Sequence, residues 1–174
     1  LATQYCDEAM LYNFSDEHRL ITWRDIWISL AEIEKSLGLH ITSAQIAQMK
    51  RFRARINYGK IAKYERETRH EIVGNIKAYA EQCPKAKPII HLGATSALVT
   101  DNADLIIYKH ALAEIKRQMS DFIRQLGRFA LRHMDVPTCG FTHLQPALLT
   151  TVGKRACLWL QDFVMVLKEL NHLT

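Results

Sequence analysis

The feature that most constrains the fold is a heptad pattern that begins near Ser96 and meets no proline before Pro137. Apolar residues recur every seven positions in two rows, which predicts one continuous α-helix with a single apolar stripe. The first row is Leu98, Leu105, Leu112, Met119 and Leu126, and the second is Tyr108, Ile115, Phe122 and Phe129. At 1.5 Å per residue this helix is roughly 55 Å long, which favours an elongated helical bundle over one small globule.

A second long helix is expected after a break at 135–145. Pro146 suits the first turn of that helix, where a missing N–H is not needed. Two more heptad rows follow: Val152, Trp159, Val166 and Leu173, with Leu149, Ala156, Phe163 and Leu170. This pattern is still running at Thr174, so we expect the sequence to be an N-terminal piece of a longer protein.

The segment before these helices predicts a small helical domain. Residues 1–14 read as an irregular lead-in, and Ser15 or Asp16 can cap a helix that runs to about Leu37 and stops at Gly38. An apolar stripe at helical spacing predicts the buried face of this helix. Its members are Leu20, Trp23, Trp27, Leu30 and Leu37.

Two further helices are expected before the long pair. Thr42 and Gln45 form a capping box that predicts a short helix. A third helix is expected at roughly 57–81, and two prolines place a connection at 82–94. The expected fold is therefore all-α without strands, with a small helical domain at 1–94 and the start of a central long-helix bundle at 95–174.

Composition and charge exclude several classes of protein. Apolar residues make up 48 % of the 174 residues, which is typical of a globular chain. The net charge of +5 fits an anionic partner, although the basic run at 50–55 is more typical of a solvated helix end than of a nucleic-acid surface. No run reaches membrane-spanning length, and the histidines lack metal-ligand spacing, so no membrane, nucleic acid or metal is expected. Four widely spaced cysteines indicate free thiols in a reducing cytoplasm.

Polar residues interrupt the helical pattern in three clusters, at 69–71, 91–96 and 140–151. Each has an ordinary structural explanation: a solvated face, helix caps, or a histidine satisfied in a loop. The last two clusters stand before the two long helices, however, and helix N-termini bind phosphate and carboxylate groups. Gly93 and Ala94 would let a ligand approach the backbone closely. From the residues alone we infer a helical protein with an anion site.

Three segments resemble the adenylosuccinate lyase family of the fumarase/aspartase superfamily, and the likeness extends over the whole chain. They are RHEIVGN at 69–75, IIHLGATSALVTDNADLI at 89–106 and GFTHLQPALLTTVGKR at 140–155. The resemblance implies an all-helical homotetramer whose active sites are each assembled from three subunits. It implies cleavage of adenylosuccinate to AMP and fumarate, and of the succinylated aminoimidazole carboxamide ribotide (SAICAR) to AICAR and fumarate. No metal or organic cofactor is implied.

The resemblance also implies roles for particular residues. His143 matches the family's general acid for the departing nitrogen, and Thr142 beside it matches a substrate-binding position. His70 lies in the family's substrate-binding R-H-D motif. The other residues implied to bind substrate are Arg69 and Glu71 beside His70, Thr95 and Ser96 at the succinyl portion, and Gln4 and Tyr5 near the phosphate.

Three departures from the family pattern bear on the function. Gln4 stands where the family has an arginine, which removes a bidentate phosphate partner. Glu71 replaces an aspartate and lengthens the side chain by one methylene. The family's mobile loop S-S-x-M-P-x-K-x-N-P, which supplies the serine base, does not occur in the 174 residues. We therefore expect these residues alone not to turn over substrate.

Two other interpretations remain open from the sequence. Another lyase of the superfamily, such as argininosuccinate lyase, would share the bundle and the general chemistry. A non-catalytic helical oligomerisation module would explain the heptads but would not require Thr-Ser and Thr-His turns.

For a β-elimination, histidine is a suitable acid because it titrates near neutrality.

Overall fold

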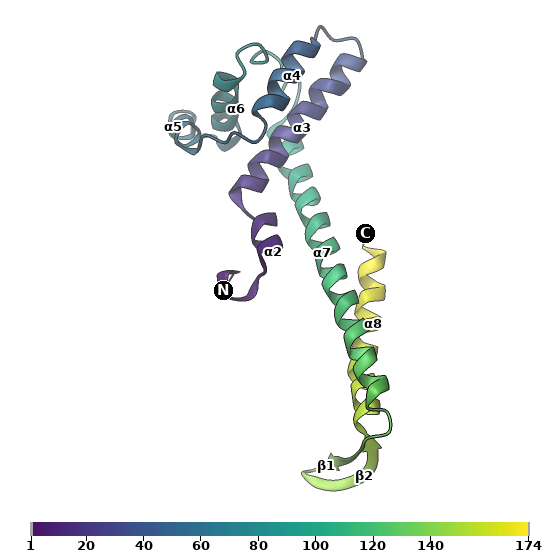
Figure 1. The fold of residues 1–174 in the computed structure, drawn as a ribbon. Coiled ribbons are helices and arrows are strands. Elements are labelled where there is room, and N and C mark those ends of the chain that lie inside the picture. The colour runs from purple at the N-terminus through teal and green to yellow at the C-terminus, as the bar shows by residue number, and fades with distance from the viewer. Residues whose placement is uncertain (1, 174) are drawn as a thin grey trace. The chain divides into compact units, whose positions relative to one another are not determined.

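A computed structural model describes residues 2–173 (Figure 1). The chain divides into two compact units, with the boundary between Tyr108 and Lys109. The fold is all-α with one two-stranded sheet, which confirms the expected class. The helices of the first unit are α1 (Ala2–Tyr5), α2 (Glu8–Asn13), α3 (Asp16–Ser36), α4 (Ser43–Phe52), α5 (Tyr58–Thr68), α6 (Glu71–Gln82) and the start of α7 (Ser96–Arg132).

Several helix ends lie where the sequence analysis predicts them. The Ser15 hydroxyl accepts a hydrogen bond from the His18 N–H at 3.1 Å and so caps α3. Gly38 follows α3 with a φ of 94°, a conformation that costs glycine little. The capping box of Thr42 and Gln45 is present at the start of α4. The lead-in was wrongly expected to be irregular, because it contains α1 and α2, the latter capped by Asp7.

The single helix expected at 57–81 is also wrong, since the chain breaks there into α5 and α6. Arg69 has a left-handed φ of 55° and His70 is extended. A Cβ at Gly74 of α6 would lie 2.8 Å from the Glu65 backbone nitrogen, so α6 packs closely against α5 at that glycine. Arg69 and His70 of the polar cluster therefore lie in a turn between two helices, and Glu71 is the first residue of α6.

The core of the first unit contains one buried cation. Arg24 is 2 % exposed and donates through Nη1 to the carbonyl oxygens of Phe52, Arg53 and Arg55 at 2.7, 3.2 and 3.1 Å. These carbonyls lie at the end of α4, where the helix dipole favours positive charge. The guanidinium also lies 4.2 Å from the centroid of the Tyr79 ring. Burial lowers the pKa of Arg24, and the carbonyl contacts compensate for the lost hydration.

Cys83 lies in this core, and the reactivity of its thiol tests how tightly the core is packed. The thiol is fully buried, and burial raises its pKa to about 11. Since only the thiolate reacts, we expect iodoacetamide at pH 8 to modify Cys83 at least about 100-fold more slowly than the exposed Cys6. Mass spectrometry of a time course gives both rates in one sample. Equal rates under native conditions would contradict the described packing, and equal rates in urea are the control.

The second unit contains a β-hairpin that was not expected. The hairpin strands are β1 (Pro137–Thr142) and β2 (Gln145–Thr151), and the unit also contains the end of α7 and the helix α8 (Val152–His172). Pro146 lies in β2 opposite Phe141, so its predicted place in the first turn of a helix is wrong. A two-stranded sheet tolerates a proline because each strand has an unpaired edge. The second long helix instead begins at Val152, where the Thr151 hydroxyl accepts from the Lys154 N–H at 3.1 Å.

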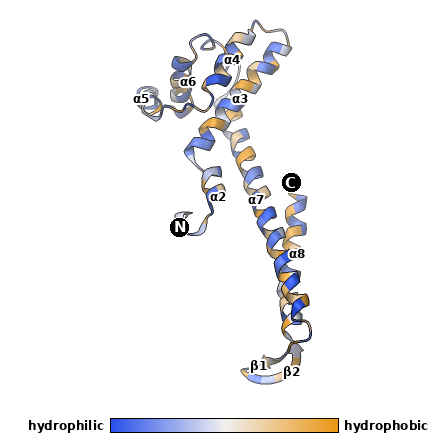
Figure 2. Cartoon of the chain, in the orientation of Figure 1, coloured by the Kyte–Doolittle hydropathy of each residue, from blue (hydrophilic) through white to orange (hydrophobic). Residues whose placement is uncertain are grey.

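Apolar residues recur along both long helices (Figure 2), and several of their side chains are exposed. Leu105 is 66 % exposed and Tyr108 is 54 % exposed on α7, and Trp159 is 54 % exposed on α8. Within the second unit, Phe122 of α7 meets Phe163 of α8 edge-on, with ring centroids 4.7 Å apart. The packing of two helices against each other leaves much of each apolar row in water, which favours association.

We therefore expect the 174-residue chain to form dimers or larger species at micromolar concentration. Sedimentation velocity checks this expectation. A Leu105→Lys variant should shift the distribution toward monomer, whereas Lys63→Ala on α5, an exposed change away from the apolar rows, should not. A compact monomer that does not associate at these concentrations would contradict the bundle interpretation.

Candidate active site

The structure brings two of the predicted site residues together at the start of α7. His70 precedes α6 as its N-cap residue, but its side chain makes no capping hydrogen bond. Its Nε2 instead lies 3.4 Å from the Oγ of Ser96, the first residue of α7. Thr95 comes directly before Ser96 and is exposed. An imidazole and two hydroxyls thus lie at the N-terminus of a 37-residue helix, where free N–H groups favour an anion.

Arg69 and Glu71 lie on either side of His70. Both line a surface pocket of about 480 Å³ together with Ala62, Glu65 and Arg66. Glu71 forms an ion pair with Arg19 of α3 at 3.1 Å, which ties the start of α6 to α3. This partner was not foreseen, because fifty-two positions separate the two residues in the sequence. The left-handed φ of Arg69 turns the chain, so that α6 begins directly after His70.

His91 is a polar residue just before α7 that the sequence analysis did not name as a site residue. Its Nδ1 accepts a hydrogen bond from the Trp27 indole N–H at 3.0 Å. Burial and the nearby charge of His70 both lower the pKa of His91, so the neutral imidazole is favoured. Its φ of 66° is left-handed. His91 stands in the same 91–96 cluster as Thr95 and Ser96, which was a signal in the sequence, but its partner Trp27 lies 64 positions away.

Gln4 and Tyr5 lie in the four-residue helix α1. Both are exposed, Tyr5 by 75 %. The carbonyl of Ala2 accepts from the Cys6 N–H at 2.9 Å, which closes this short turn. The structure thus places the two predicted phosphate-side residues on a small exposed element.

Thr142 and His143 belong to the hairpin of the second unit. Thr142 pairs with Gln145, which leaves His143 and Leu144 as a two-residue turn. Their φ values of 48° and 63° are both left-handed, as a type I′ hairpin turn requires. Glycine and asparagine usually fill such positions, so the His-Leu pair carries backbone strain. His143 is exposed at the turn, and Leu144 is 93 % exposed.

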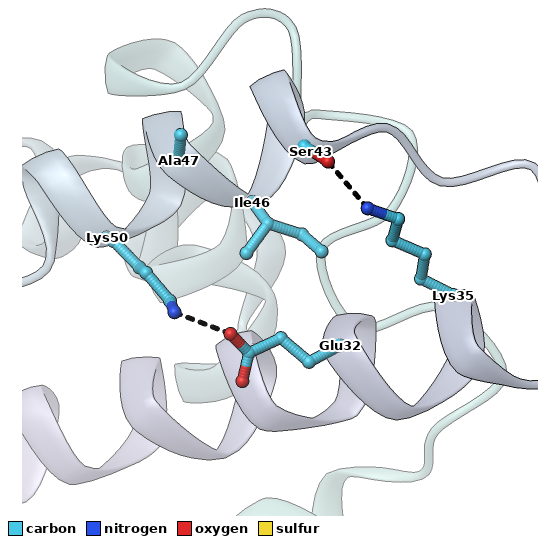
Figure 3. A pocket seen from close by; sticks show the side chains of 6 residues that line it. All are labelled: Glu32, Lys35, Ser43, Ile46, Ala47 and Lys50. Carbon is cyan, nitrogen blue, oxygen red and sulfur yellow. Dashed lines mark hydrogen bonds and ion pairs between the residues drawn. The ribbon is translucent and has the colours of Figure 1, made fainter.

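Another pocket, of about 380 Å³, lies between α3 and α4 (Figure 3). Its charged side chains are paired with neighbours: Lys50 with Glu32, and Lys35 with the Ser43 hydroxyl at 2.6 Å. Exposed pairs of this kind contribute little to the free energy of unfolding, and their charges are balanced without a ligand. This pocket contains none of the predicted site residues.

The described residues also bear on other classes of site. Among residues 2–173, no group of three or more His, Cys, Asp or Glu side chains is arranged to hold a metal ion. Within the same range, every helix is too short or too polar to cross a membrane.

Nearly the whole chain is similar in sequence to known proteins. The chain is 42 % identical over 173 residues to "Adenylosuccinate lyase" of Schistosoma mansoni, covering 99 % of this chain and 36 % of that protein. It is 44 % identical to "Adenylosuccinate lyase" of Schizosaccharomyces pombe, covering 97 % of this chain and 36 % of that protein. The chain thus spans about a third of the length of these relatives.

A solved structure and a family model extend the comparison. The structure is the 3-carboxy-cis,cis-muconate lactonizing enzyme of Pseudomonas putida, with a TM-score of 0.87 and 28 % identity, covering 99 % of this chain and 41 % of that one. The model of the lyase family matches residues 22–174. Since this match covers most of the sequence, the chain belongs to the lyase family.

Proposed function

We propose that the complete protein is a lyase that cleaves adenylosuccinate to AMP and fumarate, and SAICAR to AICAR and fumarate. The observation that carries this proposal is the 42 % and 44 % identity to two proteins named adenylosuccinate lyase, over nearly the whole chain. The start of α7 also supports it. His70 and Ser96 lie in contact there beside the free N–H groups of the helix, and an elimination from adenylosuccinate needs such donors to bind a succinyl carboxylate.

The proposed chemistry is a β-elimination. A base removes a proton from the succinyl carbon next to a carboxylate, the electron pair forms the C=C bond of fumarate, and the C–N bond breaks. His143 donates a proton to the departing nitrogen. The serine base of the family lies in the loop motif that these 174 residues lack.

The start of α7 is proposed to hold the succinyl portion. The carboxylate beside the reacting carbon gains negative charge as the proton leaves. Thr95 and Ser96 can donate hydroxyl hydrogen bonds to it, and the free N–H groups of the first turn add positive potential. These donors are in place before the reaction, so little reorganisation accompanies the charge shift.

The remaining predicted residues are proposed to bind the nucleotide end. Arg69 supplies a positive charge beside His70, while Glu71 holds this turn through its ion pair with Arg19. Gln4 and Tyr5 are proposed to lie near the substrate phosphate. Gln4 can donate through its amide but carries no charge, so phosphate attraction depends on other cations.

We also propose that the protein works as a homotetramer in the cytoplasm. The exposed apolar rows of α7 and α8 supply surfaces for association, and His143 is exposed at a hairpin turn where a neighbouring subunit can cover it. Exclusion of water around the reacting atoms strengthens electrostatic catalysis. The thiols of Cys6, Cys83, Cys139 and Cys157 are free, which suits a reducing compartment.

The test is a substrate comparison with the complete protein. Fumarate release is followed by its ultraviolet absorbance with adenylosuccinate, SAICAR and argininosuccinate. We expect turnover of the first two and none of the third. Turnover of argininosuccinate alone would assign the protein to a different lyase, and a folded, oligomeric protein inactive on all three would favour an oligomerisation module.

A further inference from the structure

We propose that Trp27 is a positioning residue: its indole N–H holds His91 in the tautomer whose proton is on Nε2, so that His91 offers a neutral N–H donor to the anionic substrate. This inference rests on the proposed lyase function for its substrate. It assigns to a tryptophan in the core of the first unit a role that the packing alone does not require.

The direction of the hydrogen bond determines the tautomer. An indole N–H can only donate, so the His91 Nδ1 that lies 3.0 Å from it must accept. A nitrogen that accepts in this way carries no proton, and the neutral ring then carries its proton on Nε2. Trp27 is 1 % exposed, so the indole cannot turn away into water.

Ring packing keeps the donor in place. The Trp27 and His91 rings meet edge-on, with an interplanar angle of 88° and centroids 6.1 Å apart. A second aromatic neighbour of the indole is Tyr79, whose ring is stacked with it at the same centroid distance of 6.1 Å. The hydroxyl of Tyr79 donates to the Met49 carbonyl at 2.7 Å, which fixes that ring in turn. The indole therefore has one orientation, and its N–H has one direction.

The backbone presents His91 beside the α7 terminus. The φ of His91 is 66° and that of Gly93 is 64°, so the segment before α7 contains two left-handed residues. The Ala94 N–H donates to the His91 carbonyl at 3.4 Å, which closes the turn that leads to Thr95 and Ser96. A left-handed histidine is a strained choice, and strain of this kind gathers at functional sites.

The charge environment acts in the same direction. His70 lies near enough to His91 that its charge disfavours a charge on His91. An imidazolium would also place an N–H at Nδ1 against the indole N–H, which would break the hydrogen bond. Both effects favour the neutral donor, which can bind a carboxylate or phosphate oxygen without first taking up a proton.

Two variants of the complete protein test this role. Trp27→Phe keeps an aromatic ring but removes the N–H. Trp23→Phe is the matched control, since Trp23 is a buried residue of the same helix whose indole N–H has no hydrogen-bond partner. Solid-state ¹⁵N NMR of histidine-labelled protein reports the protonation of each ring nitrogen, and His91→Gln assigns the signals.

In the unchanged protein we expect His91 with a bare Nδ1 and a protonated Nε2. In Trp27→Phe the other tautomer should appear, and KM for adenylosuccinate should rise about tenfold or more while kcat changes less, because a hydrogen bond to a charged substrate group is lost. Trp23→Phe should leave both the tautomer and KM unchanged. A protonated Nδ1 in the unchanged protein would overturn the proposal even if Trp27→Phe did not fold.

Two other results would also overturn it. One is an unchanged His91 tautomer in a folded Trp27→Phe protein. The other is an equal rise in KM for the two phenylalanine variants, which would show a general packing effect. If the unchanged protein released no fumarate, the proposed function would fail, while the tautomer measurement would still decide whether Trp27 positions His91.

Discussion

His143→Gln in the complete protein is expected to lower the turnover of adenylosuccinate by about 10²–10⁴-fold. Glutamine keeps a polar side chain of similar reach but cannot deliver a proton near neutral pH. The C–N bond would then have to break without protonation of the nitrogen, or with a proton from water. General acid catalysis by a positioned side chain is worth a factor of this size.

The same variant should bind substrate nearly as well as the unchanged protein, because Thr95, Ser96 and the cationic groups hold the succinyl and phosphate ends. It should also keep its melting temperature, since His143 is exposed at the hairpin turn. His40→Gln is the control, as it makes the same change at an exposed histidine outside the predicted site. A folded His143→Gln protein with near-normal turnover would remove His143 from the role of general acid.

The hairpin that carries His143 shows why the site could be predicted only in part. The segment 140–151 was correctly identified as a polar cluster before a helix, but Pro146 was interpreted as the first turn of that helix. A proline suits both a first helical turn and an edge strand. The left-handed turn gave no local signal either, because His143 and Leu144 occupy positions that glycine or asparagine usually mark. Only strand pairing from Pro137 to Thr151 distinguishes the two structures.

Local signals predicted other parts of the fold well. The caps at Ser15 and Thr42, the stop at Gly38 and the start of α7 at Ser96 each depend on residues a few positions apart. The break at Arg69 has no such signal, since neither glycine nor proline stands there. It accompanies the close packing of Gly74 against Glu65, which only the folded unit reveals.

The environment of His91 belongs to the same class of unpredictable features. A motif placed the residue near Thr95 and Ser96, but its hydrogen bond to Trp27 joins two distant parts of the chain. Periodicity correctly predicted that Trp27 is buried in the core. It could not predict that the indole N–H also has a specific acceptor. Spacing identifies the face on which a side chain lies, and tertiary packing determines which atoms meet.

Gly153→Ala should destabilise the second unit by about 3 kcal/mol, through overpacking at a contact between backbones. A Cβ at Gly153 would lie 2.7 Å from the Met134 Cα and closer still to the Ala130 carbonyl oxygen. Neither neighbour is the end of a flexible side chain. The Gly153 N–H also donates to the His133 carbonyl at 2.9 Å, so the start of α8 cannot move away without losing that bond.

Gly127→Ala is the matched control for this prediction. Gly127 lies inside α7 of the same unit, where a Cβ would meet only the Leu160 Cδ2 at an ordinary 3.9 Å. Alanine favours the helix over glycine there by up to about 1 kcal/mol, so this variant should be equally or more stable. Thermal unfolding at one protein concentration compares the two, since association contributes to the melting temperature. Equal stability of the two alanine variants would show that α7 and α8 do not approach each other at Gly153 as described.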